Sequence, residues 1–206
     1  PITLGLLLPI GISFFTFQTV GYMVDVFRGD VEAERDPVDF FLFVTFFPQL
    51  VAGPIERAGH LLAQVQTPRR ASAEDFRWGI QAALRGIVKK VVVADSLAGV
   101  VSQLFAQESL SGPLVFVASL AFAFQIYCDF SGYSDMALAC SALLGYRLRL
   151  NFYFPFFSTN ITDFWRRWHV SMSSWLRDYL YIPLGGNRGG KLFVYRNLMI
   201  TLVLCG

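Results

Sequence analysis

The sequence has little charge for its length. Of its 206 residues, 16% are Asp, Glu, Lys or Arg, whereas 54% are hydrophobic. Soluble domains carry about 25% charged residues, so this chain is short of the charge that covers a water-facing surface. The shortage argues against an ordinary soluble domain and predicts a protein embedded in a membrane.

Cysteine is also scarce, and repeats are absent. Cys128, Cys140 and Cys205 lie in apolar surroundings without a CxxC pair, which favours small buried side chains over a disulfide framework or a zinc site. We therefore expect no metal centre. The net charge is +2 and the basic residues form no single stripe, so we expect no nucleic acid as a partner.

Long apolar runs alternate with polar connections. Residues 2–24 and 86–106 are each long enough to cross a hydrocarbon core of about 30 Å. Residues 40–55 contain two prolines and a glycine, which is typical of a short or re-entrant helix. A longer stretch, residues 113–146, is interrupted by polar residues at 128–135. These runs predict an all-α, multi-pass transmembrane protein with re-entrant and amphipathic interfacial helices.

The chain begins and ends within apolar runs. We therefore expect a single membrane-embedded domain over residues 1–206 that is truncated at both ends. Positive charge is concentrated at residues 56–90 and 147–191, and acids at residues 25–39. The positive-inside rule then predicts that the first two segments face the cytoplasm and that residues 25–39 lie outside. Ser72 and Asp75 have the spacing of a helix start.

An aromatic and basic helix is predicted after Asn160, because this residue and Asp163 suit a helix N-terminus. With 3.6 residues per turn, apolar and charged side chains separate onto two faces. The aromatic face holds Trp165, Trp168, His169, Met172, Trp175, Leu176 and Tyr179, and the polar face holds Asp163, Arg166, Arg167, Ser171, Ser173, Ser174, Arg177 and Asp178. The arginines suit lipid headgroups or a phosphorylated ligand.

His169 lies on the aromatic face, away from the arginines. Two interpretations remain open: a core histidine bonded to a backbone carbonyl, or a general base. Imidazole titrates nearest neutral pH, and a desolvated pocket favours its neutral, proton-accepting form. The other histidine, His60, lies beside Gly59 in a basic connection and is predicted to be solvated or interfacial.

Asp129 and Asp135 are unusual because they lie within an apolar stretch. A carboxylate there is costly and indicates a functional site by default. The alternative is a polar helix junction whose acids bond freed amides or arginines of the basic helix. The glycine-rich residues 183–190 lack the Lys-Ser/Thr pair of a P-loop, so nucleotide binding by that mechanism is not expected.

Several blocks resemble one known family. Residues 163–171, Asp-Phe-Trp-Arg-Arg-Trp-His-Val-Ser, and 175–188, Trp-Leu-Arg-Asp-Tyr-Leu-Tyr-Ile-Pro-Leu-Gly-Gly-Asn-Arg, are similar to the signature of the membrane-bound O-acyltransferase (MBOAT) family. The blocks at residues 9–18, 47–55 and 129–135 resemble the same family. The likeness covers nearly the whole chain and is closest to the branch typified by the membrane subunit of alginate O-acetyltransferase.

The resemblance implies a helical membrane fold around a funnel or tunnel. It implies that His169 is one of two histidines associated with acyl transfer, the second lying in a Trp-His-Gly context that we expect beyond Gly206, so this fragment alone would be inactive. Residues around His169 and in the acidic block are predicted to support the site or its substrate: Asp129, Asp135, Trp165, Arg166, Arg167, Trp168, Arg177 and Asp178.

The activity that the resemblance implies is O-acetylation of an exported polysaccharide at the cell inner membrane. Acetyl-CoA is the expected acyl donor, with no bound cofactor. Membrane lipid, a periplasmic or extracellular acetyltransferase and the polysaccharide export machinery are the expected partners. Two alternatives are kept: a subunit that D-alanylates teichoic acids, and a non-catalytic transporter or scaffold, which would not need His169.

Overall fold

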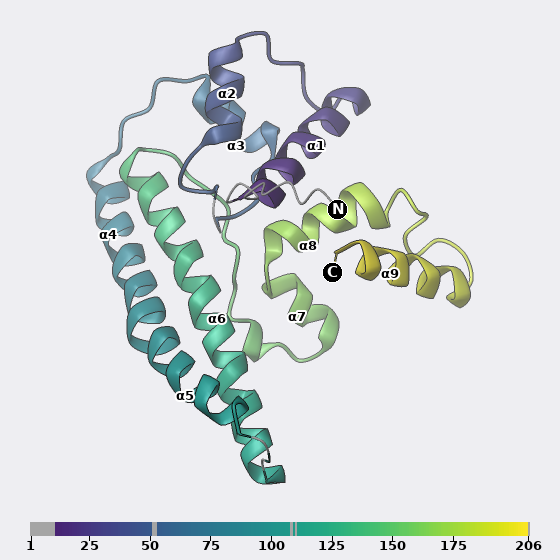
Figure 1. Cartoon of the computed structure of the whole chain (residues 1–206). Coiled ribbons are helices and arrows are strands. Elements are labelled where there is room, and N and C mark those ends of the chain that lie inside the picture. The colour runs from purple at the N-terminus through teal and green to yellow at the C-terminus, as the bar shows by residue number, and fades with distance from the viewer. Residues whose placement is uncertain (1–10, 51–52, 108, 110, 206) are drawn as a thin grey trace, which may run out of the picture. The chain divides into compact units, whose positions relative to one another are not determined.

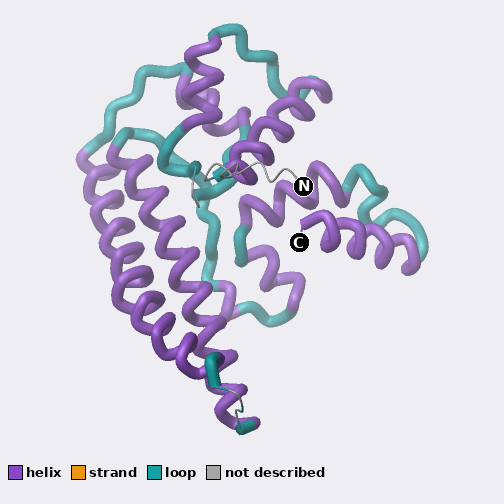
Figure 2. The backbone as a smooth tube through the Cα atoms, viewed as in Figure 1, coloured by secondary structure: helices purple, strands orange, loops and turns teal. Residues whose placement is uncertain are grey.

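The computed structural model describes residues 11–50, 53–107, 109 and 111–205, and every regular element in them is helical (Figures 1 and 2). This confirms the predicted all-α class. The α-helices are α1 (Ile12–Arg28), α2 (Pro37–Thr45), α3 (Ala58–Val65), α4 (Ala73–Ile87), α5 (Asp95–Phe105), α6 (Gly112–Leu143), α7 (Ile161–Arg167), α8 (Val170–Leu176) and α9 (Lys191–Cys205). Three shorter elements are the π-helices η1 (Val88–Ala94) and η3 (Arg177–Tyr181) and the 3₁₀-helix η2 (Pro155–Phe157).

The chain divides into two compact units. The first unit contains residues 1–68 and 149–206, and the second unit contains residues 69–148. The single domain predicted from the sequence stays a prediction, and the two units are described separately.

In the second unit, α4, η1 and α5 form a continuous helical run beside α6 (Figure 1). The helix start predicted at Ser72 is confirmed, because Ser72 Oγ accepts a hydrogen bond from the Asp75 amide at 3.1 Å and the Asp75 carboxylate accepts one from the Ser72 amide at 3.0 Å. Two glycines let the helices approach closely. A Cβ added to Gly86 would lie 2.7 Å from the Gly132 carbonyl oxygen.

The break predicted within residues 128–135 is wrong. α6 continues through them as one helix (Figure 1). Their acids are neutralised by lysines of η1: Lys89 Nζ lies 2.8 Å from Asp135, and Lys90 Nζ lies 2.6 Å from Asp129. Because η1 supplies these cations, Asp129 and Asp135 have partners without any break in the backbone hydrogen bonds of α6. The partners are therefore lysines, and not the arginines or freed amides of the polar-junction alternative.

Among the described residues, α6 is the one helix that is both long and apolar enough to cross a membrane. Its 32 residues rise about 48 Å at 1.5 Å each, more than a hydrocarbon core of about 30 Å. Residues 86–106 are helical as far as Phe105. Part of the other predicted span, residues 2–24, lies outside the described residues, and α1 begins at Ile12.

In the first unit, buried residues of α2 and α3 form a small core that includes Phe43 and Leu61, both fully buried. The interruption predicted within residues 40–55 is confirmed: α2 has 9 residues and is followed by a turn. Buried amides hold this turn, since Gln18 Nε2 donates to the Phe43 carbonyl oxygen at 2.7 Å and Gln49 Nε2 donates to Gln18 Oε1 at 2.8 Å.

Two contacts in the first unit argue against the topology predicted from charge. Gln66 donates a hydrogen bond to Glu34, and Arg28 donates one to the carbonyl oxygen of Asp178 at 3.4 Å. A direct hydrogen bond cannot join two sides of a core of about 30 Å. Part of residues 25–39 therefore lies beside the C-terminal end of α3 and beside η3, and the membrane side of each segment stays a prediction.

Candidate functional site

The helix predicted to carry His169 is broken at that residue. Asn160 caps α7 as predicted, since its Oδ1 accepts from the Asp163 amide at 2.8 Å. The helix then ends at Arg167, Trp168 is extended, and His169 has φ 44° and ψ 54° in the left-handed region. α8 starts at the next residue. The single amphipathic helix of the sequence analysis is thus wrong, and His169 occupies a junction between two short helices.

A left-handed conformation is unfavourable for a residue with a side chain, by roughly 1–2 kcal/mol, so other contacts must hold the junction. Two backbone hydrogen bonds do so. The Tyr153 amide donates to the Arg167 carbonyl oxygen at 2.9 Å, and the Val170 amide donates to the Asn151 carbonyl oxygen at 2.8 Å. The segment before η2 therefore holds the chain on both sides of His169.

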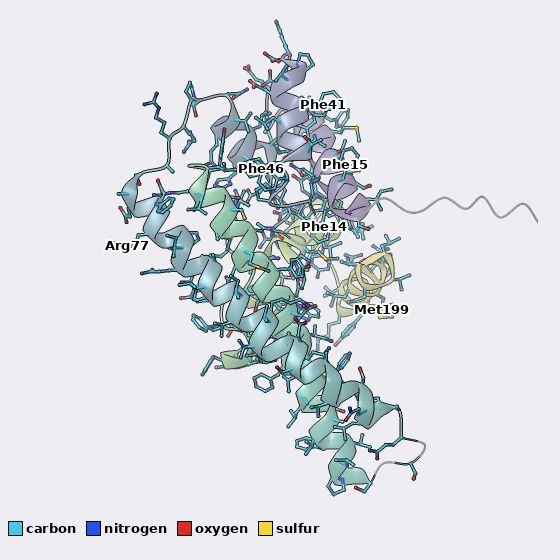
Figure 3. The ribbon with its side chains drawn as sticks, turned by 60° about the vertical axis from the view of Figure 1, so that its left-hand side comes forward. Phe14, Phe15, Phe41, Phe46, Arg77 and Met199 are labelled. Carbon is cyan, nitrogen blue, oxygen red and sulfur yellow. The ribbon has the colours of Figure 1, made fainter. Side chains whose placement is uncertain are left out.

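Aromatic rings flank the His169 imidazole. Phe152, in the same segment, and Phe14, on the first turn of α1 (Figure 3), each have their ring centroid 6.4 Å from that of His169. Their planes are inclined to the imidazole by 22° and 26° respectively, so both rings lie nearly parallel to it. The predicted aromatic surroundings of His169 are confirmed, although these two rings come from elements other than its own helix.

The imidazole is partly buried, and its Nδ1 lies 3.0 Å from Oδ1 of Asn151. Burial lowers the pKa of His169 to about 4, because desolvation penalises the imidazolium. The ring is therefore neutral at pH 7. The partner is a side-chain oxygen, and not the backbone carbonyl that the core interpretation anticipated. Whether His169 is catalytic stays a prediction.

The aromatic and basic residues of α7, and Trp168 just after it, take different positions. Trp168 packs against Phe152 in an edge-on contact with ring centroids 5.1 Å apart and stacks on Phe164 at 5.5 Å. Trp165 and Arg166 are exposed. Arg167 pairs with Asp163 at 3.0 Å, and this bond lowers the pKa of the Asp163 carboxyl. Of these predicted support residues, Trp168 and the Arg167 backbone therefore contact the segment that holds His169.

Asp178 joins η3 to the segment before α3, and Arg177 bonds the same carboxylate. Asp178 accepts hydrogen bonds from Arg177 Nε at 2.7 Å and from Arg57, just before α3. Burial acts to raise the pKa of Asp178, but these two guanidinium groups outweigh burial and lower it. The next residue, Tyr179, donates to the buried Asp25 carboxylate at 2.6 Å. Asp178 and Tyr179 therefore hold η3 against Arg57 and α1, and a role of Arg177 and Asp178 in supporting the site stays a prediction.

Asp129 and Asp135 belong to the second unit, where each is paired with a lysine as described above. Their ion pairs connect α6 to η1. A functional role for either acid stays a prediction.

His60 differs from its predicted environment. Its Nδ1 lies 2.6 Å from Oε2 of Glu56, whose side chain is fully buried. The other Glu56 oxygen accepts from the Arg149 amide at 2.6 Å. His60 is thus half-buried against a carboxylate, and not simply solvated, because Glu56 needs partners that compensate for its lost hydration.

The sequence analysis missed Asn151, Phe152 and Glu56. The first two lie in an irregular aromatic segment without helical periodicity, so their proximity to His169 arises from the fold alone. Glu56 lies four residues before His60, and this spacing could have indicated a pair had the start of α3 been recognised.

Comparison with known proteins identifies the family. The model of the family described as MBOAT, membrane-bound O-acyltransferase family, matches residues 33–205. The chain belongs to this family. This confirms the resemblance of the signature blocks, and it makes the His169 junction part of an MBOAT fold.

Three relatives of this MBOAT chain are named for different activities. A probable alginate O-acetylase of Pseudomonas syringae pv. tomato is 48% identical over 97% of this chain and 38% of the relative. A peptidoglycan O-acetyltransferase of Helicobacter pylori is 38% identical over 99% of this chain and 44% of the relative. A teichoic acid D-alanyltransferase of Streptococcus thermophilus is 32% identical over 88% of this chain and 45% of the relative. The chain thus spans less than half the length of each.

Proposed function

We propose that this chain is the part of a membrane O-acyltransferase that carries one catalytic histidine, His169. The enzyme transfers acetyl groups from a cytoplasmic donor towards hydroxyls of an exported, alginate-like polysaccharide. The observation that carries the proposal is the neutral, partly buried imidazole at the α7–α8 junction, with Nδ1 3.0 Å from Asn151 and an aromatic ring on each of two neighbouring segments. Family membership supports the reaction class.

The proposed chemistry needs one base. His169 takes the proton from the attacking hydroxyl while the hydroxyl oxygen forms a bond to the thioester carbonyl carbon of acetyl-CoA. The carbon–sulfur bond breaks and the thiolate leaves, after which the imidazolium returns the proton to the sulfur. General base catalysis of this kind contributes about 10²–10⁴-fold. The low pKa of His169 favours this role, because the imidazole is present in its neutral form throughout the physiological pH range.

The membrane setting is also a proposal. We place the protein in the cell inner membrane with several spans, α6 being one of them. Its exposed residues suit lipid contact: Phe116, Val117, Leu120 and Phe124 are 47–66% exposed, and such apolar surface is unfavourable in water. In this setting a periplasmic or extracellular acetyltransferase would receive the acetyl group and act together with the polysaccharide export machinery.

Other acceptors share the same hydroxyl chemistry. The 48% identity to a probable alginate O-acetylase favours alginate-like polymers over peptidoglycan, whose acetyltransferase is 38% identical, and over D-alanyl transfer to teichoic acid, at 32%. A transporter or scaffold remains the alternative from another class. That alternative requires no function of His169.

The experiment is the replacement of His169 by alanine in the full-length protein, in its native host. We expect the O-acetyl groups on the secreted polysaccharide, quantified by NMR, to fall by at least about 100-fold per unit of enzyme, in line with loss of a general base. Immunoblots of the membrane fraction normalise the amounts.

The matched control is His60→Gln, which replaces the other histidine and keeps a hydrogen-bond donor for the buried Glu56. It should retain acetylation at equal abundance. Unchanged acetylation in the His169→Ala strain would contradict the proposal and favour a core role for this residue.

A further inference from the structure

One buried amide determines which nitrogen of His169 can act as a base. Asn151 is 1% exposed, and its Oδ1 faces three polar atoms. They are Nδ1 of His169 at 3.0 Å, Oγ of Ser171 at 2.9 Å and the backbone amide nitrogen of Ser171 at 3.3 Å. Asn151 therefore joins the histidine to the first turn of α8.

The Ser171 amide fixes the orientation of the Asn151 side chain. A backbone N–H can only donate, so the atom that faces it must be the amide oxygen. If the oxygen and nitrogen were exchanged, two donors would meet in a buried site, which costs about 1–3 kcal/mol. The assignment of Oδ1 towards His169 thus rests on the Ser171 backbone amide, which can act only as a donor.

This orientation determines the tautomer of His169. Since Oδ1 only accepts, Nδ1 of the imidazole must carry the hydrogen that it donates. In the neutral ring the other nitrogen, Nε2, is then the basic one. The direction of proton transfer is set before any substrate binds.

Asn151 is itself held in place by the fold. Its carbonyl oxygen accepts from the Val170 amide at 2.8 Å. The next residue, Phe152, lies nearly parallel to the imidazole and packs edge-on against Trp168. The same short segment thus places the amide and one of the rings that limit imidazole rotation.

An amide has a different electrostatic effect from a carboxylate at this position. A carboxylate would orient Nδ1 equally well, but its charge would stabilise the imidazolium. Three residues around His169, namely Asn151, Phe14 and Phe152, carry side chains that do not titrate, and the low pKa of the ring arises from burial. Asn151 therefore orients the ring and leaves it neutral.

We propose that Asn151 is a positioning residue that holds His169 in the Nδ1–H tautomer and so presents Nε2 as the proton-accepting atom. The proposal deepens the proposed function and rests on it for the catalytic meaning of Nε2. The tautomer itself is a property of the protein and is measured independently of activity.

The test uses the full-length protein in lipid nanodiscs, with histidines labelled by ¹³C and ¹⁵N and the His169 signals assigned by their loss in His169→Ala. At pH 7 the ring should show the Nδ1–H tautomer. In Asn151→Asp the tautomer should persist, while the pKa of His169 rises by about 1–3 pH units because of the nearby carboxylate. The acid limb of kcat for acetyl transfer should move upwards with it.

Two further variants separate positioning from general stability. Asn151→Ala, if it folds, should mix the tautomers and lower kcat more than it changes KM. Ser171→Ala removes one neighbour of Asn151 but keeps the backbone donor, so it should leave both the tautomer and the acid limb unchanged. Asn151→Asp remains informative if Asn151→Ala fails to fold, because the carboxylate retains an acceptor oxygen in the place of Oδ1.

An Nε2–H tautomer in the wild-type protein, or an Asn151→Asp variant whose His169 pKa does not rise, would overturn the proposal. The proposal would also be overturned if Ser171→Ala mixed the His169 tautomers as much as Asn151→Ala does. If His169→Ala retained acetyl transfer while the Nδ1–H tautomer was observed, the proposed function would fail, whereas the orientation by Asn151 would stand.

Discussion

At the scale of single residues, burial of His169 makes folding depend on pH. The pKa of the ring is about 6.5 in the unfolded chain and is lowered by burial to about 4 in the fold. Between these values the unfolded chain binds more protons, so the free energy of unfolding decreases as the pH falls from 6.5 towards 4. The slope is at most about 1.4 kcal/mol per pH unit.

We therefore predict that the thermal midpoint of the full-length protein falls between pH 7 and pH 4.5 by more than that of His169→Gln, which does not titrate. The acid limb of the acetyl-transfer rate should lie near pH 4, well below the ordinary histidine value. Calorimetry and product analysis by NMR at stepped pH measure the two quantities. Parallel curves for the two proteins, or a limb near 6.5, would contradict the predicted burial of His169.

The surroundings of His169 were easier to predict from the sequence than its backbone conformation. The aromatic residues around it and the Asn160 cap could be recognised, because each follows from local composition or spacing. The left-handed backbone at His169 could not, because a helical pattern in the sequence continues through Trp168 and Val170. The contact with Asn151 joins positions 18 residues apart, and no periodic pattern reports such a contact.

At the scale of elements, the close approach of α4 and α6 makes a specific demand on glycine. A Cβ on Gly132 would lie 2.9 Å from the Gly86 carbonyl oxygen, and a Cβ on Gly86 would lie 2.7 Å from that of Gly132. Both obstacles are backbone atoms, which cannot rotate away. Small residues allow helix backbones to approach in this way within membranes.

We predict that Gly132→Ala lowers the stability of the protein by about 1–3 kcal/mol, the usual cost of overpacking. Its matched control is Gly99→Ala in α5, where an added Cβ would meet nothing within 4 Å. Alanine there should raise stability by about 0.5–1 kcal/mol, because it favours the helix over the unfolded chain. Thermal unfolding of both variants in one detergent measures the difference, and equal midpoints would contradict the packing of α4 against α6.

The wrong prediction of a break in α6 has its origin at the same scale. A run of polar residues in an apolar stretch suggests an interrupted helix when it is considered alone. The lysines that neutralise Asp129 and Asp135 lie 39 and 46 positions earlier in the chain, on η1. Their partnership depends on the pairing of two helices, which the apolar pattern of one segment does not contain.

At the scale of the whole molecule, the topology predicted from charge conflicts with contacts in the first unit for a similar reason. It assigned residues 25–39 and 56–90 to opposite sides, although residues 40–55 between them were themselves expected to form a short or re-entrant helix. α2 has only 9 residues and rises about 14 Å, less than half of a core of about 30 Å. Short re-entrant elements return the chain to the side that it came from, so a count of apolar runs overstates the number of crossings.

We therefore predict that the connection after α1 and the turn after α3 are accessible from the same side of the membrane. Asp30 and Thr67 are both exposed, and in the same two connections Gln66 donates a hydrogen bond to Glu34. In a full-length protein whose own cysteines are replaced by alanine, Asp30→Cys and Thr67→Cys should react with a membrane-impermeant maleimide from one side only, and from the same side.

Sealed vesicles of both orientations separate the two outcomes, with permeabilised vesicles giving the total reactive thiol. Labelling of the two positions from opposite sides would contradict the hydrogen bond between Glu34 and Gln66 and restore the topology expected from charge. Labelling from one side also constrains η3, because Arg28 and Tyr179 connect the end of α1 to that element. The face that carries Asp178 would then be assigned to the same side by two independent labels.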